Sequence, residues 1–253
     1  MEGSDDQEKK NKKVKKITTF PVPFPIEQFK PSHSLNSNIS SEEKILEQAF
    51  KYHASGNIKA AAKYYEYCIN QGINDYRVFT NYGIILQSLG KLEEAEILFR
   101  KAIELNPDFA EAHNNLGAIL IDIGNLKEAE LSTRKAIELN PGFAQAHYNL
   151  GNTLRELGKL QEAEISYHTA IELNPGFAKA HYNLGTVLKD LGKRDNALAC
   201  LYKASELLKD DNLCLTAIGE VLLAQGNYDQ GIAKIKAGAG AIQFDLKNGL
   251  SIS

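Results

Sequence analysis

The sequence has few cysteines and no cysteine pair of the kind that binds metals or exchanges disulfides. Its 253 residues include three cysteines, Cys68, Cys200 and Cys214, which lie far apart and form no C-x-x-C motif. An odd and dispersed set argues against a disulfide framework and is typical of a reducing compartment. We therefore expect buried, reduced thiols and a cytoplasmic location.

Long hydrophobic runs are also missing. No window approaches the roughly 18 apolar residues of a membrane-spanning helix. The lysines around Val14–Ile17 are not followed by the apolar segment of a signal peptide. With 43% hydrophobic residues, 24% charged residues and a net charge of −3, the composition is that of a soluble chain with enough apolar material for a long core.

The common catalytic motifs are absent from the sequence as well. It contains no H-E-x-x-H, no Walker glycine loop and no nucleophile elbow. Acidic residues such as Glu128 and Glu130 lie beside Lys127, which is the pattern of a solvated helix face. We therefore predict a protein that is not an enzyme and that binds no cofactor and no metal.

What the sequence does contain is a glycine at every 34th residue. Five glycines share this spacing: Gly83, Gly117, Gly151, Gly185 and Gly219. Alanines recur 12 and 19 residues after each of the first four, and a proline recurs 24 residues after the first three. A fixed period of this length is the signature of stacked repeats, which need about three or more copies to bury a core.

Each repeat is predicted to hold two helices. Glycine pairs such as Gly124-Asn125 divide the unit, because glycine adopts the left-handed turn at a helix end without steric cost. Asn-Pro pairs such as Asn140-Pro141 end the second helix, because the residue before proline avoids the α region. Six frames fit the period: 42–75, 76–109, 110–143, 144–177, 178–211 and 212–245.

The period and its anchors resemble the tetratricopeptide repeat, in which aromatic, Leu-Gly, Ala and Pro positions recur in a fixed order. Asn149–Gly151 together with Ala163, Tyr167, Ala170 and Pro175 carry this pattern in one frame. The resemblance implies an all-α, right-handed superhelical solenoid of about six helix-turn-helix repeats. The repeats cover roughly four-fifths of the chain.

Both ends of the array depart from the pattern. The first frame has Ala49 at the glycine position, and the last has Gly231 and Gly238 in place of the alanines. We predict a poorly capped last repeat, with either a homodimer through the C-terminal repeat or a docked tail. Residues 242–246 alternate like the start of a strand, and 246–253 are assigned to a C-terminal tail.

Residues 1–41 have a different composition. Six lysines lie between Lys9 and Lys16, and the proline-rich segment Phe20–Pro25 follows them. The lysines suggest nucleic acid or an anionic membrane surface, but no aromatic residues interleave with them and the remainder of the chain is acidic. We predict a disordered basic and proline-rich tail, whose proline segment is either a polyproline II ligand or a strap on the first repeat.

Three histidines share the 34-residue spacing: His113, His147 and His181. Equivalent residues of stacked helices lie about 8–10 Å apart, whereas one zinc ion needs its ligand atoms at about 2 Å. The histidines stand where the family has an aromatic anchor. We therefore predict that they are packing residues and not metal ligands.

Four asparagines occupy one position, two residues before the glycine: Asn81, Asn115, Asn149 and Asn183. At about 100° per residue they fall on the side of the first helix opposite its apolar residues. Asparagine is a mediocre helix former, so this regularity needs a cause. Two interpretations remain open: the amides hold neighbouring turns or reflect duplication, or they bind a ligand on a solvent-facing surface.

The array most closely resembles the repeats of O-linked N-acetylglucosamine transferase, in which asparagines of this placement grip the backbone of an extended polypeptide. A primary amide offers one peptide unit both an acceptor and a donor. The resemblance implies a concave peptide-binding groove built from twelve residues: Asn81, Asn115, Asn149, Asn183, Arg77, Asn114, Tyr148, Asn152, Arg155, Lys179, Tyr182 and Lys189. Acidic residues on the same face, among them Glu111, Asp122, Glu156 and Asp190, give the groove a mixed charge, which disfavours nucleic acid.

We therefore predict a protein-interaction scaffold that binds an extended segment of a protein or peptide in its concave groove. The alternative is a substrate-presenting N-terminal module of a glycosyltransferase-type or other transferase system, whose catalytic domain is absent from this chain. The carboxylate clamp of chaperone-binding tetratricopeptide domains is disfavoured, because Leu213 and Ala217 stand where its last basic pair belongs.

Overall fold

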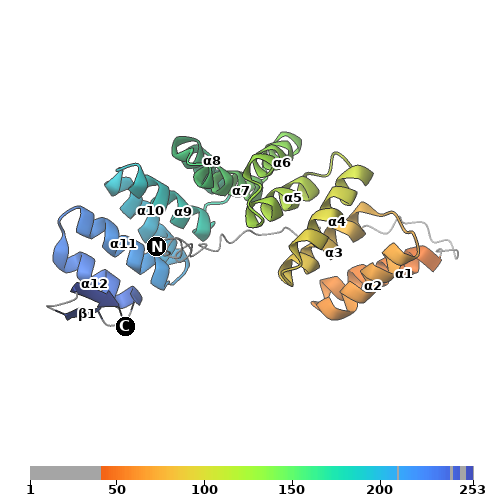
Figure 1. The fold of residues 1–253 in the computed structure, drawn as a ribbon, viewed down its shortest axis with the longest axis horizontal. Coiled ribbons are helices and arrows are strands. Elements are labelled where there is room, and N and C mark those ends of the chain that lie inside the picture. Colours follow the sequence, from red (N-terminus) through yellow and green to blue (C-terminus); the bar gives the residue numbers. More distant parts are fainter. Residues whose placement is uncertain (1–40, 210, 240–241, 246–248, 253) are drawn as a thin grey trace, which may run out of the picture.

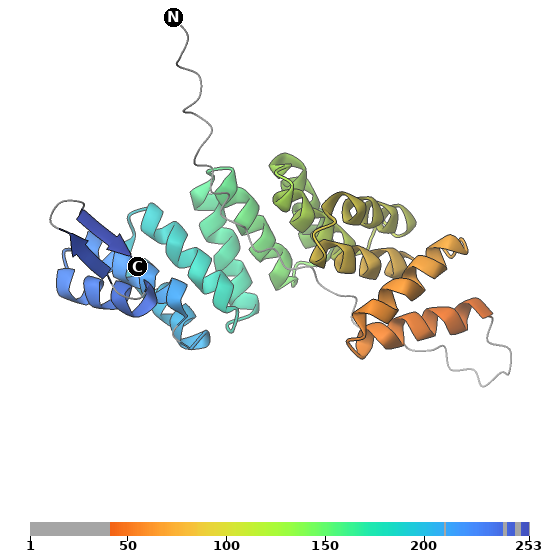
Figure 2. The same ribbon diagram turned by 60° about the horizontal axis from the view of Figure 1, so that its bottom comes forward.

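The computed structural model describes residues 41–209, 211–239, 242–245 and 249–252. In these residues helices stack pairwise into a curved array (Figures 1 and 2). The helices on the inner, concave side of the array are α1 Ser41–Ala54, α3 Tyr76–Ser88, α5 Ala110–Asp122, α7 Ala144–Glu156, α9 Ala178–Asp190 and α11 Asn212–Ala224. Those on the outer, convex side are α2 Ile58–Asn70, α4 Leu92–Leu105, α6 Leu126–Leu139, α8 Leu160–Leu173, α10 Arg194–Leu207 and α12 Tyr228–Ala239.

This arrangement confirms the predicted all-α solenoid, with one helix pair in each of the six frames. The predicted N-terminal tail lies almost wholly outside the described residues. Each inner helix contacts its own outer helix. From α3 onward each also contacts the outer helix of the preceding pair, and several contact the next inner helix. The inner helices are therefore covered on more than one side.

The six glycines between paired helices adopt the left-handed conformation that the sequence predicts. Their φ angles lie between 73° and 85°, at Gly56, Gly90, Gly124, Gly158, Gly192 and Gly226. The Asn-Pro boundaries also agree with the prediction. The outer helices α4, α6 and α8 end before Asn106, Asn140 and Asn174, which have extended φ angles of −142°, −140° and −140°.

The glycine at every 34th residue permits a close crossing of the paired helices. A Cβ atom on Gly151 would lie 2.6 Å from a ring carbon of Tyr167, and one on Gly117 would lie 2.5 Å from the Thr133 methyl group. Gly83, Gly185 and Gly219 have the same relationship to the next helix, at 2.5–2.7 Å. The recurring alanines at both other positions are fully buried in frames two to five, as close helix packing requires.

The two glycines of the last repeat permit close packing between its own helices. Cβ atoms on Gly231 and Gly238 would lie 3.0 Å from the Gly219 carbonyl oxygen and 2.5 Å from the Asn212 carbonyl oxygen, so α12 approaches α11 more closely than alanine permits. The poorly capped outer face of this repeat and a dimer through it remain predictions.

The sixth frame also ends earlier than predicted. Helix α12 stops at Ala239, and Ile242–Asp245 forms strand β1, in line with the alternation seen in the sequence. Strand β2, Gly249–Ile252, pairs with β1 in antiparallel register, with Ile242 opposite Ile252 and Asp245 opposite Gly249. Residues 249–252 are therefore part of a hairpin rather than a plain tail, and β1 contacts α12 (Figure 1).

Candidate functional site on the concave face

The four asparagines are buried, which contradicts the predicted solvent-facing surface. The exposed fraction is 3% for Asn81, 0% for Asn115 and Asn149, and 9% for Asn183. The helical wheel of an isolated helix has one buried side, whereas these helices also pack against their neighbours in the stack.

The amides instead bind the preceding repeat. Asn149 donates through Nδ2 to Oδ1 of Asn114, 2.9 Å away. Asn183 donates to Oδ1 of Asn152 at 2.8 Å and to the hydroxyl oxygen of Tyr148 at 3.2 Å. Each of these bonds joins an inner helix to the inner helix before it, so the regular spacing of the asparagines serves to connect successive repeats.

Asn81 continues the pattern in the second repeat. Its side chain hydrogen-bonds Tyr65 of the first repeat, a contact that lowers the Tyr65 pKa against the larger upward shift caused by burial. Asn115 accepts at Oδ1 a bond from Nδ2 of its neighbour Asn114, at 3.3 Å. The interpretation in which amides hold neighbouring structure therefore accounts for the contacts seen.

Three further residues of the predicted groove belong to the same buried network: Asn114, Asn152 and Tyr148, with exposed fractions of 0%, 0% and 3%. Oδ1 of Asn152 also accepts a bond from the Tyr167 hydroxyl at 2.8 Å. Within the described residues, Nδ2 of Asn152 is buried and has no hydrogen-bond partner. Burial raises the pKa of both Tyr148 and Tyr167, so both hydroxyls stay protonated donors at neutral pH.

Arg77 is held by its own repeat. Its guanidinium pairs with the Asp75 carboxylate through Nε, at 2.9 and 3.1 Å, and through Nη2, and it lies 5.1 Å from the Phe50 ring centre. The same Asp75 caps the start of α3 by accepting the Arg77 backbone N–H. These contacts fix the side chain at the second repeat, away from the other predicted basic residues.

The remaining predicted residues are partly exposed and lie on the inner helices of repeats four and five. Arg155 lies on α7, Lys179, Tyr182 and Lys189 lie on α9, and Glu220 follows on α11. Lys189 pairs with Glu220 at 2.7 Å, with side chains 31% and 51% exposed. Arg155 pairs with its neighbour Glu156 at 3.2 Å. We call Arg155, Tyr182, Lys189 and Glu220 the inner polar cluster.

Electrostatics link the members of the inner polar cluster. Burial is the largest influence on Tyr182 and raises its pKa, and the charge of Glu220 adds to the rise. Lys189 and Arg155 act on the same hydroxyl in the opposite direction. Side chains from three successive inner helices therefore share one electrostatic environment. Lys179, near the start of α9, is not part of this cluster, and partial burial lowers its pKa because its charged form is less solvated there.

Glu220 was missed by the sequence analysis. It stands at the position held by Ala118, Asn152 and Thr186 in the three preceding repeats. Aligning the sixth frame with the others places Glu220 on the inner helix beside the predicted basic residues.

The three histidines have a role that differs from core packing. Nε2 of each ring hydrogen-bonds a proline carbonyl oxygen six residues earlier: His113 with Pro107 at 2.8 Å, His147 with Pro141 and His181 with Pro175 at 3.0 Å. The rings are partly exposed, so they fix the turn between repeats rather than fill the core. Among the described residues, no three His, Cys, Asp or Glu side chains lie together as metal ligands would.

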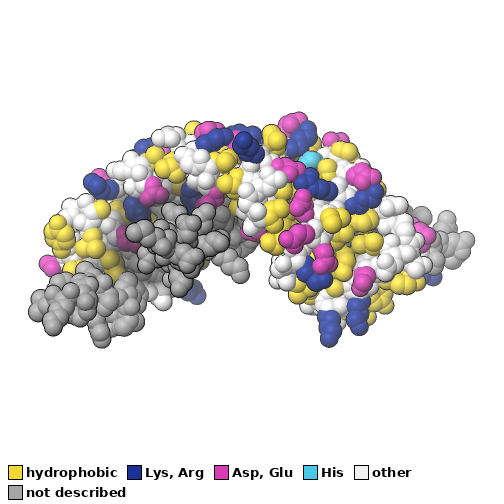
Figure 3. Space-filling view, in the orientation of Figure 1, with side chains coloured by type: hydrophobic (Ala, Val, Ile, Leu, Met, Phe, Trp, Pro, Cys, Tyr) yellow, Lys and Arg dark blue, Asp and Glu magenta, His cyan; other side chains and the backbone are white. Residues whose placement is uncertain are grey.

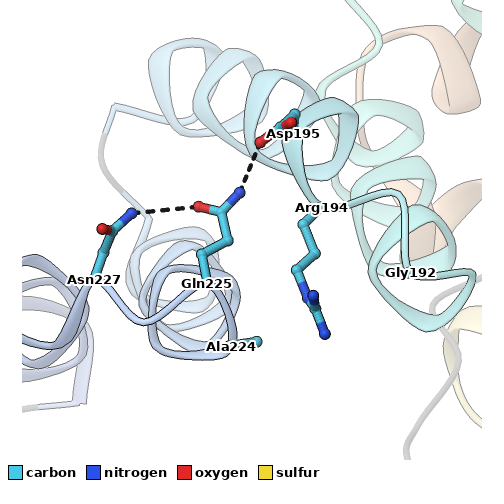
Figure 4. Close-up of a pocket in the computed structure, with 6 residues that line it drawn as sticks. All are labelled: Gly192, Arg194, Asp195, Ala224, Gln225 and Asn227. Carbon is cyan, nitrogen blue, oxygen red and sulfur yellow. Dashed lines mark hydrogen bonds between the residues drawn. The ribbon is translucent and has the colours of Figure 1, made fainter.

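An open depression lies between the turns of repeats five and six (Figure 4). Gln225 donates to Asp195 at 2.7 Å and accepts a long bond of 3.5 Å from Asn227, while Arg194 extends beside them. These polar groups connect two successive turns.

The three cysteines are free thiols: Cys68 and Cys214 are buried as predicted, whereas Cys200 is only partly buried. None of the described helices is long and apolar enough to cross a bilayer.

Comparisons with known proteins agree with this geometry. Models of the tetratricopeptide repeat match residues 110–143, 144–177 and 178–210, and a related repeat model matches 83–124. Together these matches run from residue 83 to residue 210, which is half of the 253 residues. No curated protein matches the chain.

Several solved structures are similar to this one. A crystal structure of MamA has 26% sequence identity and a TM-score of 0.57, and the alignment covers 62% of this chain and 91% of that one. YrrB, described as a tetratricopeptide protein with an unusual peptide-binding site, has 24% identity and a TM-score of 0.58, with 70% and 92% coverage. PilF of Pseudomonas aeruginosa has 15% identity and a TM-score of 0.66, with 76% and 88% coverage.

Proposed function

Because the chain belongs to the tetratricopeptide repeat family, we propose that it is a protein-interaction scaffold whose concave face binds an extended segment of a partner protein. The observation that carries this proposal is the inner polar cluster, in which Arg155, Tyr182, Lys189 and Glu220 from three successive helices share one environment. Such a continuous surface suits a chain that crosses several repeats. The peptide-binding site described for YrrB supports the same use of the fold.

The ion pairs within the cluster are weak enough to be exchanged. Lys189–Glu220 and Arg155–Glu156 are both partly exposed, and pairs of this kind contribute about 0–1 kcal/mol each. A carboxylate of a partner segment can therefore replace Glu220 or Glu156 at little cost. Tyr182 adds a half-buried ring and hydroxyl beside the two cations, which favours a segment with an acidic residue next to an apolar one.

The buried amide network supports this surface from beneath. Asn149 and Asn183 connect α7 and α9 to the helices before them, so the exposed side chains are presented by helices in fixed register. Pre-organisation of this kind reduces the entropy lost on binding. We therefore assign the asparagines a positioning role and the inner polar cluster the contact with the partner.

An array of peptides displayed on a solid support tests the proposal. The wild-type chain is expected to enrich peptides that contain acidic residues, with affinity on the order of micromolar. The variant Arg155→Ala/Lys189→Ala should lose at least about tenfold in affinity for those peptides, equivalent to about 1.4 kcal/mol. The control Arg134→Ala/Lys193→Ala also removes one arginine and one lysine from exposed ion pairs, but on the convex side.

The control variant should bind as the wild type does. Equal loss in both variants would mean that net charge, rather than the concave face, determines binding. If Arg155→Ala/Lys189→Ala binds these peptides as tightly as the wild type does, the inner polar cluster is not the binding site. The transferase-module alternative concerns a catalytic partner, and it gains support only if a transferase is recovered with the chain in a pull-down from the native cell.

A further inference from the structure

Glu220 is a charged residue at a position that is otherwise uncharged in the repeats. All six residues of this position lie on inner helices, so an anion enters this part of the concave face in the last repeat. The Glu220 side chain is 51% exposed, and core packing therefore does not account for it. The uncharged equivalents in the five preceding frames are Phe50, Ile84, Ala118, Asn152 and Thr186.

Glu220 binds a cation of the inner polar cluster. Its Oε2 atom accepts a hydrogen bond from Lys189 Nζ at 2.7 Å, and this bond joins α11 to α9. Burial opposes the charge on Lys189, but the bond from Glu220 and its negative charge outweigh burial and raise the Lys189 pKa. Lys189 is therefore positive at neutral pH, and an anion of the same chain already matches its charge.

Glu220 also has the surroundings that the proposed function gives to a carboxylate of the partner. Burial is the largest influence on the pKa of Tyr182, and the charges of Glu220, Lys189 and Arg155 act on that hydroxyl as well. An anion beside two cations and a tyrosine hydroxyl is bound much as a ligand carboxylate would be. In the free chain, Glu220 therefore takes the place that the acidic residue of a partner segment needs.

We propose that Glu220 is an internal competitor, a carboxylate that occupies Lys189 until an acidic residue of the partner segment displaces it. The inference rests on the proposed function and adds how the site selects its ligand. Two carboxylates at one ammonium group repel each other, so Glu220 opposes every acidic segment that does not replace it. Selectivity often depends on such a repulsive element as well as on attractive contacts.

The structure permits the displacement. The side chains of Lys189 and Glu220 are 31% and 51% exposed, so Glu220 can turn into solvent without opening the core. Repeats five and six remain joined when this ion pair breaks, because Gln225 still donates to Asp195 at 2.7 Å and α10 still contacts α11. The exchange therefore changes the partner of Lys189 and leaves the stack of helices in place.

Fluorescence anisotropy with the full chain tests the proposal. The probes are the tightest acidic peptide from the array and a counterpart in which Asn and Gln replace its Asp and Glu residues. Glu220→Gln should bind the acidic peptide about three- to fivefold more tightly than the wild type, as expected when an exposed ion pair no longer competes. It should bind the neutral counterpart as the wild type does.

Glu162→Gln is the matched control. Glu162 is 52% exposed and pairs with Arg134 of the preceding repeat, on the convex side. Figure 3 shows positive and negative side chains side by side along the outer edge of the arch, so the control removes the same charge from a surface of interspersed charges. It should bind both peptides as the wild type does.

A double-mutant cycle tests whether Glu220 acts through Lys189. In the Lys189→Ala background, Glu220→Gln should bring no gain in affinity for the acidic peptide, because the cation for which the two carboxylates compete is gone. A gain of the same size in both backgrounds would overturn the proposal, since Glu220 would then act through net charge alone. An equal gain for the neutral peptide would overturn it as well.

Two further outcomes would contradict the proposal. Equal affinity of Glu220→Gln and the wild type would show that Glu220 does not compete, and weaker binding by Glu220→Gln would show that it orients Lys189 for the partner. If Glu220→Gln lowers the melting temperature, Glu220→Thr gives the same test with the residue that α9 carries at this position, Thr186. Failure of the wild type and of Glu220→Gln to bind any acidic peptide would instead refute the proposed function itself.

Discussion

Asn149 donates a hydrogen bond from Nδ2 to Oδ1 of Asn114, 2.9 Å away in the preceding repeat, and neither side chain has any exposed surface. Gln145, one turn earlier on α7, donates to Oδ1 of the same Asn149 at 3.2 Å. A buried amide with partners on both of its ends connects the third repeat to the fourth. This relationship turns the repeated asparagine from a ligand-binding candidate into a structural connection.

We expect Asn149→Ala to destabilise the array. The substitution leaves Oδ1 of Asn114 buried without this donor, and a buried group that loses its partner costs about 1–3 kcal/mol. Urea titration followed by circular dichroism measures the loss in free energy of unfolding. The control Asn196→Ala removes an exposed asparagine from α10 and should change stability by no more than about 0.5 kcal/mol. Equal stability of Asn149→Ala and the wild type would contradict the structural role.

A second substitution tests the close crossing of paired helices. Gly151→Ala introduces a Cβ atom 2.6 Å from the Tyr167 ring, so the ring or the helix must move. Overpacking of this kind costs about 1–3 kcal/mol, and thermal unfolding should show a lower melting temperature. Gly142→Ala is the control, because its nearest contact is 3.6 Å away, at Asn140 Oδ1. A pair of variants with equal melting temperatures would show that the crossing tolerates a methyl group.

The repeats and their turns could be predicted because they depend on local chemistry. The glycine φ angles follow from the cost of a side chain in the left-handed conformation, and the helix ends at Asn106 and Asn140 follow from the proline after each. The period alone also located six helix pairs. Stacking a unit on its own copies leaves little freedom in how the elements are arranged.

The burial of the asparagines could not be predicted in the same way. A helical wheel assumes one buried side, but the width of that side depends on how closely neighbouring inner helices approach. Asn115 and Ala118 are buried, while Asp122, one turn after Ala118, is exposed. The sequence carries the periodicity of each helix and has no local signal for the spacing between helices of different repeats.

The two fully buried thiols should make stability fall in alkaline solution. Burial raises the pKa of Cys68 and of Cys214 to about 11 from 9.0, and nearby Asp75 and Asp211 add to the rise. Between about pH 9 and pH 11 the unfolded chain therefore loses thiol protons that the folded chain keeps, so the free energy of unfolding decreases as pH rises. Below about pH 9 the contribution is fully present.

The double variant Cys68→Ala/Cys214→Ala should lack this part of the pH dependence. Alanine holds the equivalent positions in other repeats, at Ala102 for Cys68 and at Ala146 for Cys214, so the variant should fold normally at neutral pH. Urea titrations at about pH 8 and about pH 10.5 compare the two proteins. Parallel losses in the wild type and the double variant would show that other groups, such as the buried tyrosines, cause the decline.

Acid should weaken the ion pairs of the convex side through Glu130. The hydrogen bond from Lys159 and the bond from Arg134 lower its pKa, although burial opposes them. A carboxyl group with a lowered folded pKa stabilises the fold above its unfolded pKa of about 4.3, and the stabilisation is lost as pH falls below that value. The side chain is 15% exposed, so this contribution exceeds that of a fully solvated pair.

Glu130→Gln measures that contribution. At pH 7 we expect the variant to lose about 1 kcal/mol of unfolding free energy, because Lys159 of the next repeat and Arg134 of α6 lose a shared anion. At about pH 3 the two proteins should converge, since protonated glutamate and glutamine are both neutral. Glu162→Gln is the control: it removes a 52% exposed partner of the same Arg134 and should cost less than about 0.5 kcal/mol. A difference between Glu130→Gln and the wild type that stays constant from neutral to acid pH would assign the loss to packing rather than to charge.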